Sequence, residues 1–246
     1  PDLTEVLELA LDISEKSAGA FDITVGPLVN LWGFGPDGRI LHAPAEEAIE
    51  QIRKRVGFSY LALDKSTRTL SKSRESYIDL SAIAKGYAVD QLARLLESYG
   101  ISSYLVEIGG ELRAKGVKPG GNHWRIAVES PVNAASRSVQ TVINVKDVGI
   151  ATSGDYRNYF EENGQRFSHT IDPITGKPIH HRLASVTVLA PTCAEADALA
   201  TTLMVMGPDN GYKFAVDQKI DALFIVKTDQ GFVEKETSGF KRYKVQ

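Results

Sequence analysis

Apolar residues recur at helical spacing in several parts of the chain. The first of these segments follows Asp2 and Glu5, which have the spacing of a capping box, and it ends near Gly19, a typical helix stop. A break at Gly207-Pro208 separates two further segments near the C-terminus. The pattern predicts helices over residues 2–19, 45–55, 85–99, 194–206 and 212–217.

Short β-rich runs lie between these helices and are separated by turn residues such as Asp64-Lys65-Ser66. Strands are predicted over residues 60–63, 68–71, 104–108, 111–117, 124–129, 139–145, 150–153, 156–160, 185–190, 222–226 and 232–235. Because the strands of the middle region follow one another closely, we expect a meandering antiparallel sheet. Helices without regular βαβ alternation predict an α+β fold with a mixed, largely antiparallel sheet and packed helices. We find neither a repeat nor a low-complexity linker, so we predict a single domain over residues 1–246.

Composition narrows the class of protein. With 246 residues, 43% of them hydrophobic, the chain can bury one large core or two smaller ones. The net charge is -3, the isoelectric point is about 6.0, and no lysine and arginine cluster is interleaved with aromatic residues, so nucleic acid is not an expected partner. The single cysteine, Cys193, excludes an internal disulfide and a cysteine-rich metal site.

The start of the sequence is unusual. The chain begins at Pro1, without an initiator methionine, and enters a predicted helix almost at once. We therefore expect a processed or trimmed product, from which a targeting segment or lipid anchor would have been lost. No apolar run approaches the roughly 20 residues that span a bilayer.

His169 is the first candidate for chemistry. A strand-like run ends at Asp172-Pro173, and Gly176 and Pro178 then turn the chain, so the imidazole is held at a strand end. An imidazole can take up a proton near neutral pH. The alternative is a surface residue, or a side chain whose hydrogen bonds are already satisfied.

A second candidate is the segment over residues 77–87. A β-like Tyr77-Ile78-Asp79 leads through small residues into a helix whose first turn carries Lys85. Helix N-termini favour anions, and a lysine there strengthens such a site, so phosphate is the expected ligand. The alternative is an N-cap aspartate followed by an ordinary amphipathic helix.

A third candidate pairs Asp197 with Thr201. The two residues are four apart and share a helical face, while the alanines between them leave that face open. A carboxylate and a hydroxyl are oxygen ligands suited to Mg²⁺, which fills the rest of its shell with water and substrate phosphates. Glu195 projects elsewhere. The alternative is an alanine-rich packing helix with two incidental polar residues.

Three weaker signals accompany these. Gly109-Gly110 lies between two predicted strands, where side chains are absent as at a bulge or beside a flat ligand. The segment lacks the glycine spacing of a dinucleotide-binding loop or a P-loop. Thr152-Ser153 precedes a turn but lacks the surroundings of a nucleophile elbow, which favours turn chemistry with some ligand contact. Small residues around Phe21 and Asp22 would admit a flat heteroaromatic ring, although Phe21 also suits a simple core position.

Taken together, these segments resemble the ApbE family of bacterial FAD:protein FMN transferases, also called flavin transferases. The resemblance covers nearly the whole chain in the family's order, and it implies an ApbE-like fold related to the T-fold. The motifs that carry it are Ala20-Phe21-Asp22, Asp79-Leu80-Ser81-Ala82-Ile83-Ala84-Lys85-Gly86-Tyr87, Ile108-Gly109-Gly110, Ala151-Thr152-Ser153-Gly154, His169-Thr170-Ile171-Asp172-Pro173 and Glu195-Ala196-Asp197-Ala198-Leu199-Ala200-Thr201.

The resemblance implies a reaction in which FMN moves from FAD to a threonine hydroxyl of an acceptor protein, with release of AMP. It implies that His169 is the base and that Mg²⁺ is held by the backbone carbonyl of Ala82 and the side chains of Asp197 and Thr201. It also implies FAD contacts at Ala20, Phe21, Asp22, Asp79, Lys85 and Ile171.

This assignment agrees with the chemistry of phosphoryl transfer. A threonine hydroxyl is a poor nucleophile, so a positioned imidazole would contribute around 10² to 10⁴ in rate. The departing phosphate needs Mg²⁺ and Lys85, because phosphoryl transfer depends mainly on positioning and electrostatic stabilisation. Cys193 is then not needed as a nucleophile, and we expect it to pack in a helix.

The resemblance also concerns partners and location. It implies an acceptor among the subunits of membrane redox complexes and a periplasmic enzyme, lipid-anchored to the inner membrane in its full-length form. Family members usually start well upstream, so we expect this chain to lack the family's N-terminal segment and to bind FAD more loosely. Two alternatives stay open: an FAD pyrophosphatase that gives FMN and AMP, and a non-catalytic flavin-binding protein.

Overall fold

The computed structural model describes residues 2–38, 40, 42–131, 138–155, 159–162 and 165–245. It divides the chain into two compact units, and each is built from segments that are separate in the sequence. The first unit comprises Pro1–Ala82 and Asn158–His180, and the second comprises Ile83–Arg157 and His181–Gln246. The expected single domain over residues 1–246 stays a prediction.

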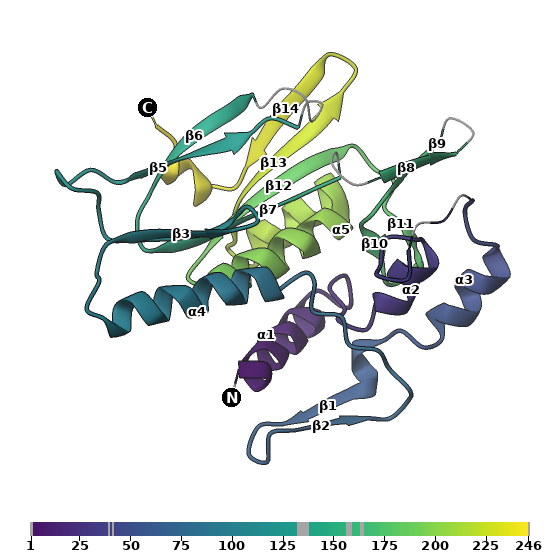
Figure 1. Cartoon of the computed structure of the whole chain (residues 1–246). Coiled ribbons are helices and arrows are strands. Elements are labelled where there is room, and N and C mark those ends of the chain that lie inside the picture. The colour runs from purple at the N-terminus through teal and green to yellow at the C-terminus, as the bar shows by residue number, and fades with distance from the viewer. Residues whose placement is uncertain are drawn as a thin grey trace. The chain divides into compact units, whose positions relative to one another are not determined.

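The first unit combines helices with short hairpins (Figure 1). Its core contains Leu28, Trp32, Ile49 and Ile171, against which Phe167 packs. Its helices are α1 (Asp2–Lys16), α2 (Gly26–Leu31), α3 (Glu46–Arg53) and the 3-10 turn η1 (Phe58–Tyr60). Its strands pair in sequence order as β1 (Leu61–Asp64) with β2 (Thr69–Lys72), β8 (Tyr159–Glu162) with β9 (Gln165–Ser168), and β10 (Ile171–Asp172) with β11 (Lys177–Pro178).

The second unit is organised around an antiparallel sheet in the order β14-β13-β12-β7-β4-β3. Its strands are β3 (Tyr104–Ile108), β4 (Glu111–Lys115), β7 (Val148–Gly154), β12 (Leu183–Ala190), β13 (Asp221–Thr228) and β14 (Gly231–Glu236). A separate hairpin pairs β5 (Trp124–Glu129) with β6 (Val139–Val145). The helices are α4 (Ala84–Ser98), α5 (Cys193–Asp217) and the 3-10 turn η2 (Phe240–Tyr243).

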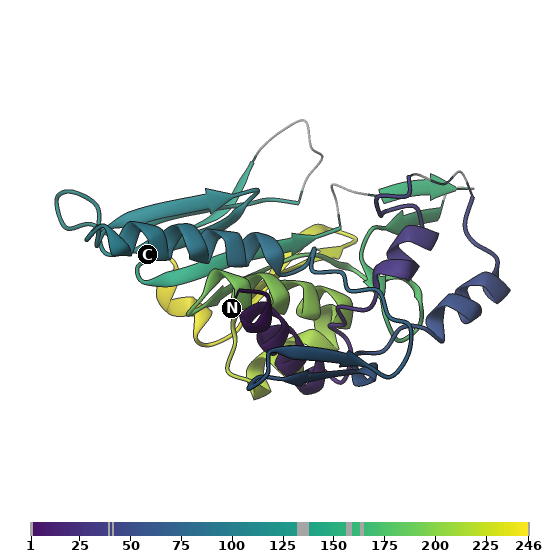
Figure 2. The same cartoon turned by 60° about the horizontal axis from the view of Figure 1, so that its bottom comes forward.

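The two faces of this sheet have different coverings. Helices α4 and α5 lie side by side on one face, where α5 contacts β7 and β12 while α4 contacts β3 and β4 (Figures 1 and 2). Side chains of the sheet that include Ile150, Leu189 and Leu223 form an apolar cluster with Val128 and Ile143 of the β5–β6 hairpin. Strand β12 is buried along its whole length because it is central and covered on both sides.

The α+β class and the antiparallel pairing are confirmed, and most predicted elements lie within a few residues of the observed ones. The expected continuous meander is wrong, because β5 and β6 form their own hairpin and β7 pairs with β4 and β12. Helix α2 was missed because it is short and starts at Gly26-Pro27, which reads as a turn. The strand predicted over residues 156–160 begins outside the described residues.

The break predicted in the last long helix is also confirmed. Gly207 has φ 77° and ψ -175°, so the helical path of α5 is interrupted there. The predicted start of the following segment at residue 212 is wrong, because helical structure resumes from Pro208, which fits a first helical turn. Among the described residues, no helix is long and apolar enough to cross a membrane.

Candidate functional site

One face of β4 carries charged residues that meet α4. Alternate residues of a strand point to the same side of a sheet, so Glu111, Arg113 and Lys115 share the face that α4 covers. Glu111 forms an ion pair with Lys85, near the start of the helix. The predicted position of Lys85 on the first turn of a helix is confirmed by the start of α4 at Ala84.

Asp197 of α5 lies beside the same lysine. Its Oδ1 is 3.9 Å from the Lys85 Nζ, and its Oδ2 accepts a hydrogen bond of 3.0 Å from the Gly86 backbone N–H. Burial raises the pKa of the Asp197 carboxyl to about 6, while Lys85 and the Gly86 N–H act to lower it and Glu111 acts to raise it. The structure therefore brings Lys85 and Asp197 together and adds Glu111, which the sequence analysis did not select.

These residues have an excess of buried negative charge. Glu111 and Asp197 are each 5% exposed, and the Oε2 of Glu111 is buried without a hydrogen-bond partner in the described part of the chain. Lys85 supplies one positive charge for two carboxylates. A buried oxygen that lacks a partner is costly, so this set of oxygen atoms fits a cation.

The kind of cation follows from the available ligands. Within the described ranges, no group of three or more His, Cys, Asp or Glu side chains is arranged to hold a metal. Thr201 is half-buried on α5, one turn after Asp197, and it supplies a hydroxyl rather than a further charge. A carboxylate and a hydroxyl on one helical face are oxygen ligands of the kind that Mg²⁺ accepts beside water and substrate phosphates.

The segment before α4 is held by Asp79. Its Oδ1 accepts hydrogen bonds from the backbone and side chain of Ser81, and its backbone N–H donates to the Ile23 carbonyl over 2.7 Å. The alternative that Asp79 caps α4 is wrong, because the N-cap position is Ile83 and no side chain caps it. Ala82 lies in the turn before the helix, as the last residue of the first unit.

Asp22 organises a loop in the first unit. Its Oδ1 accepts hydrogen bonds from the Thr24 N–H (2.7 Å) and the Thr24 hydroxyl (2.6 Å), and its Oδ2 accepts one of 2.7 Å from the Phe58 N–H. Burial raises the pKa of this carboxyl, although these hydrogen bonds act to lower it. Asp22 therefore fixes the backbone at Phe58 as well as that of its own loop.

The other predicted FAD contacts of this unit are mostly apolar and enclosed. Ala20 is 6% exposed, Phe21 is 3% exposed, and Ile171 is 5% exposed. Ile171 belongs to the apolar core of the unit, and its short strand pairs with Pro178. The contacts of Ala20, Phe21 and Ile171 with FAD stay predictions.

His169 lies in the bend between β9 and β10, so its predicted place at a strand end is confirmed. Its ring meets the edge of Phe34, with centroids 6.3 Å apart and an interplanar angle of 71°. Phe34 in turn lies against Phe160, which stacks on Phe167. The imidazole is thus held at the end of an aromatic cluster, and its role as a base stays a prediction.

The candidates therefore fall into two sets. His169, Asp22, Phe21, Ala20, Asp79, Ala82 and Ile171 belong to the first unit, whereas Lys85, Asp197 and Thr201 belong to the second. Within the second set, Lys85 lies beside Asp197. Glu111 was missed because charged residues at alternate strand positions are typical of a solvent-facing surface. The Gly109-Gly110 turn directly before it was the only available signal.

Cys193 is a packed residue of α5. It is 0% exposed, and burial is the main factor that raises the pKa of its thiol. We expect the folded protein to resist alkylation by iodoacetamide from pH 7 to pH 9, because little thiolate forms. In denaturant the same thiol should react with an ordinary pKa of about 8.5. Rapid labelling of the folded protein, followed by mass spectrometry, would contradict this expectation.

Comparison with known proteins identifies the family. The ApbE family model matches residues 1–224. A FAD:protein FMN transferase of Vibrio cholerae is 51% identical over 239 residues, which are 97% of this chain and 71% of the relative. One of Haemophilus influenzae is 48% identical over 244 residues, or 98% of this chain and 70% of the relative. The solved structure of the flavin transferase ApbE from Vibrio cholerae has a TM-score of 0.89 and 48% identity, and the match covers 99% of this chain and 77% of that one. The chain therefore belongs to the ApbE family.

Proposed function

We propose that this protein transfers FMN from FAD to an acceptor protein. The observation that carries the proposal is the match along almost the whole chain to relatives named FAD:protein FMN transferase, two of which are 48% and 51% identical to it. The cluster of Lys85, Glu111 and Asp197 supports it, because a cation and a nearby ammonium are what a diphosphate substrate requires.

Asp197 and Thr201, together with the backbone carbonyl of Ala82, would hold Mg²⁺ in this proposal. The buried carboxylates and the Glu111 oxygen without a partner support a cation at Asp197. When bound, the metal would neutralise charge on the phosphates during transfer. Lys85 would bind the diphosphate directly, because its side chain is half exposed and its ammonium lies beside the carboxylates of Glu111 and Asp197.

His169 is proposed to take the proton of the attacking hydroxyl, which we propose to be that of a threonine in the acceptor. Its position in a bend, with the ring held against Phe34, supports a fixed imidazole. A base that is held in one orientation loses little entropy when the reaction begins. The remaining contacts with FAD are proposed for Ala20, Phe21, Asp22, Asp79 and Ile171, because the family resemblance implies them.

The direct test is incubation with FAD, Mg²⁺ and a threonine-containing acceptor, followed by mass spectrometry of the acceptor and chromatography of the nucleotides. We expect an acceptor that gains one FMN, and one AMP released for each FMN attached. AMP and free FMN formed equally fast without acceptor would indicate an FAD pyrophosphatase. FAD binding without any AMP release would indicate a flavin-binding protein.

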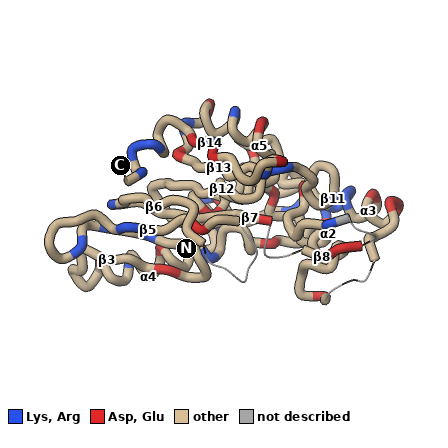
Figure 3. The backbone as a smooth tube through the Cα atoms, turned by 90° about the horizontal axis from the view of Figure 1, so that it is seen from above, with Lys and Arg blue, Asp and Glu red and all other residues tan. Residues whose placement is uncertain are grey.

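The acceptor and the location are further parts of the proposal. We propose acceptors among the subunits of membrane redox complexes and a periplasmic, lipid-anchored enzyme, because the family resemblance implies both. Acidic and basic residues are interspersed along the described backbone, as Figure 3 shows. Fractionation of cells that express the natural gene would test the location.

A further inference from the structure

Helices α4 and α5 each bind the first turn of the other. The carboxylate of Asp197, on α5, accepts a hydrogen bond of 3.0 Å from the Gly86 N–H near the start of α4. The carboxylate of Asp90, on α4, accepts one of 3.0 Å from the Cys193 N–H and one of 2.9 Å from the Ala194 N–H. The first N–H groups of a helix have no partner within the helix, so these bonds satisfy groups that would otherwise be buried alone.

The backbones at this crossing are unusually close. A Cβ atom at Gly86 would lie 2.4 Å from the Cys193 carbonyl oxygen, which leaves no room for a larger residue. Asp90 follows Gly86 by about one helical turn, and Asp197 follows Cys193 in the same way. The two carboxylates therefore stand on either side of one close contact, and a shift of α5 at its first turn would also move Asp197.

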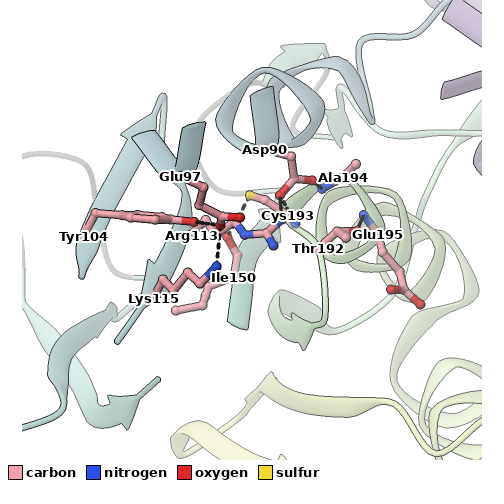
Figure 4. Close-up of polar contacts among 10 residues, drawn as sticks. All are labelled: Asp90, Glu97, Tyr104, Arg113, Lys115, Ile150, Thr192, Cys193, Ala194 and Glu195. Carbon is pink, nitrogen blue, oxygen red and sulfur yellow. Dashed lines mark hydrogen bonds and ion pairs between the residues drawn. The ribbon is translucent and has the colours of Figure 1, made fainter. Parts of the chain in front are cut away.

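Asp90 is fixed from a third direction by Arg113 of β4. Figure 4 shows the Asp90 carboxylate between the Arg113 guanidinium and the backbone N–H groups of Cys193 and Ala194. Asp90 is 1% exposed, so these partners supply the hydrogen bonds that a buried carboxylate needs. A carboxylate at a helix N-terminus also interacts favourably with the helix dipole.

We propose that Asp90, oriented by Arg113, is a positioning residue that fixes the first turn of α5 and so places the Asp197 carboxylate for the metal. The inference rests on the proposed function, in which Asp197 is a metal ligand. Asp90 would touch neither metal nor FAD. It acts through the backbone, as the residues behind a metal ligand often do.

The test is Asp90→Asn, with Mn²⁺ alone as the probe. Asparagine keeps the size of the side chain, but its NH₂ group cannot accept a hydrogen bond from a backbone N–H, so one of the two bonds and the charge are lost. We expect Mn²⁺ binding, measured by electron paramagnetic resonance without FAD, to weaken about 10- to 100-fold.

Glu97→Gln is the matched control. Glu97 also joins α4 to the strands, through Tyr104 and through Lys115 at 2.9 Å, but these bonds do not involve α5 (Figure 4). We expect this variant to lower the melting temperature while Mn²⁺ affinity stays that of the parent. A merely structural role for Asp90 would give Asp90→Asn the same behaviour, and that result would overturn the inference.

Two further measurements keep the outcomes distinct. If the parent protein binds no Mn²⁺, or binds it equally well after Asp197→Asn, the metal assignment and this inference fall together. If Asp90→Asn does not fold, Arg113→Gln takes its place, since it frees the Asp90 carboxylate on one side while leaving both backbone bonds. Weaker Mn²⁺ binding in Arg113→Gln supports the inference, and unchanged binding overturns it.

Discussion

Replacing His169 with alanine should abolish transfer of FMN to the acceptor and leave FAD binding largely intact. The reason is that the imidazole is proposed to remove a proton from a hydroxyl, a task that typically contributes 10² to 10⁴ in rate. Single-turnover transfer, followed by mass spectrometry of the acceptor, measures the loss. Quenching of FAD fluorescence measures binding separately.

The control for this variant is His180→Ala. His180 belongs to the same unit, is exposed, and follows β11, so its loss should leave transfer unchanged. Added imidazole should restore part of the activity of His169→Ala, because the variant leaves a space beside Phe34. Transfer by His169→Ala at the rate of the parent would show that the base lies elsewhere.

The fold was largely predictable because its elements follow local patterns. Glycines and turn residues separate the strands. Helix α4 was predicted from its periodic apolar residues, and the start of α5 lies one residue from the predicted one. The order of strands in the sheet was not predictable in this way. It depends on contacts between distant segments, such as β7 with β12, which no local spacing records.

The candidate site was predictable where chemistry and spacing coincide. Lys85 on a first helical turn and Asp197 with Thr201 on one face could both be inferred from the sequence alone. Glu111 and Asp90 could not. Each is a charged residue buried by an element far away in the sequence, and a lone charge in a strand or helix usually indicates a solvent-facing position.

Replacing Asp197 with asparagine should remove the metal dependence of the protein. Asparagine can still accept the hydrogen bond from the Gly86 N–H, so the contact between α4 and α5 is retained while the charge is lost. Because a ligand that binds only the folded state stabilises it, the parent should gain about 2.7 kcal/mol at Mg²⁺ concentrations 100-fold above the dissociation constant. Asp197→Asn should gain almost none.

Thermal unfolding with and without Mg²⁺ measures this difference, and Glu195→Gln is the control. Glu195 lies two residues earlier on α5, on a different face, so its variant should respond to Mg²⁺ as the parent does. Without metal, Asp197→Asn should be at least as stable as the parent, because burial disfavours the Asp197 charge. If Mg²⁺ stabilises Asp197→Asn as much as it stabilises the parent, Asp197 is not a ligand. If only Asp197→Asn loses the stabilisation by Mg²⁺, the buried carboxylate of Asp197 binds the metal.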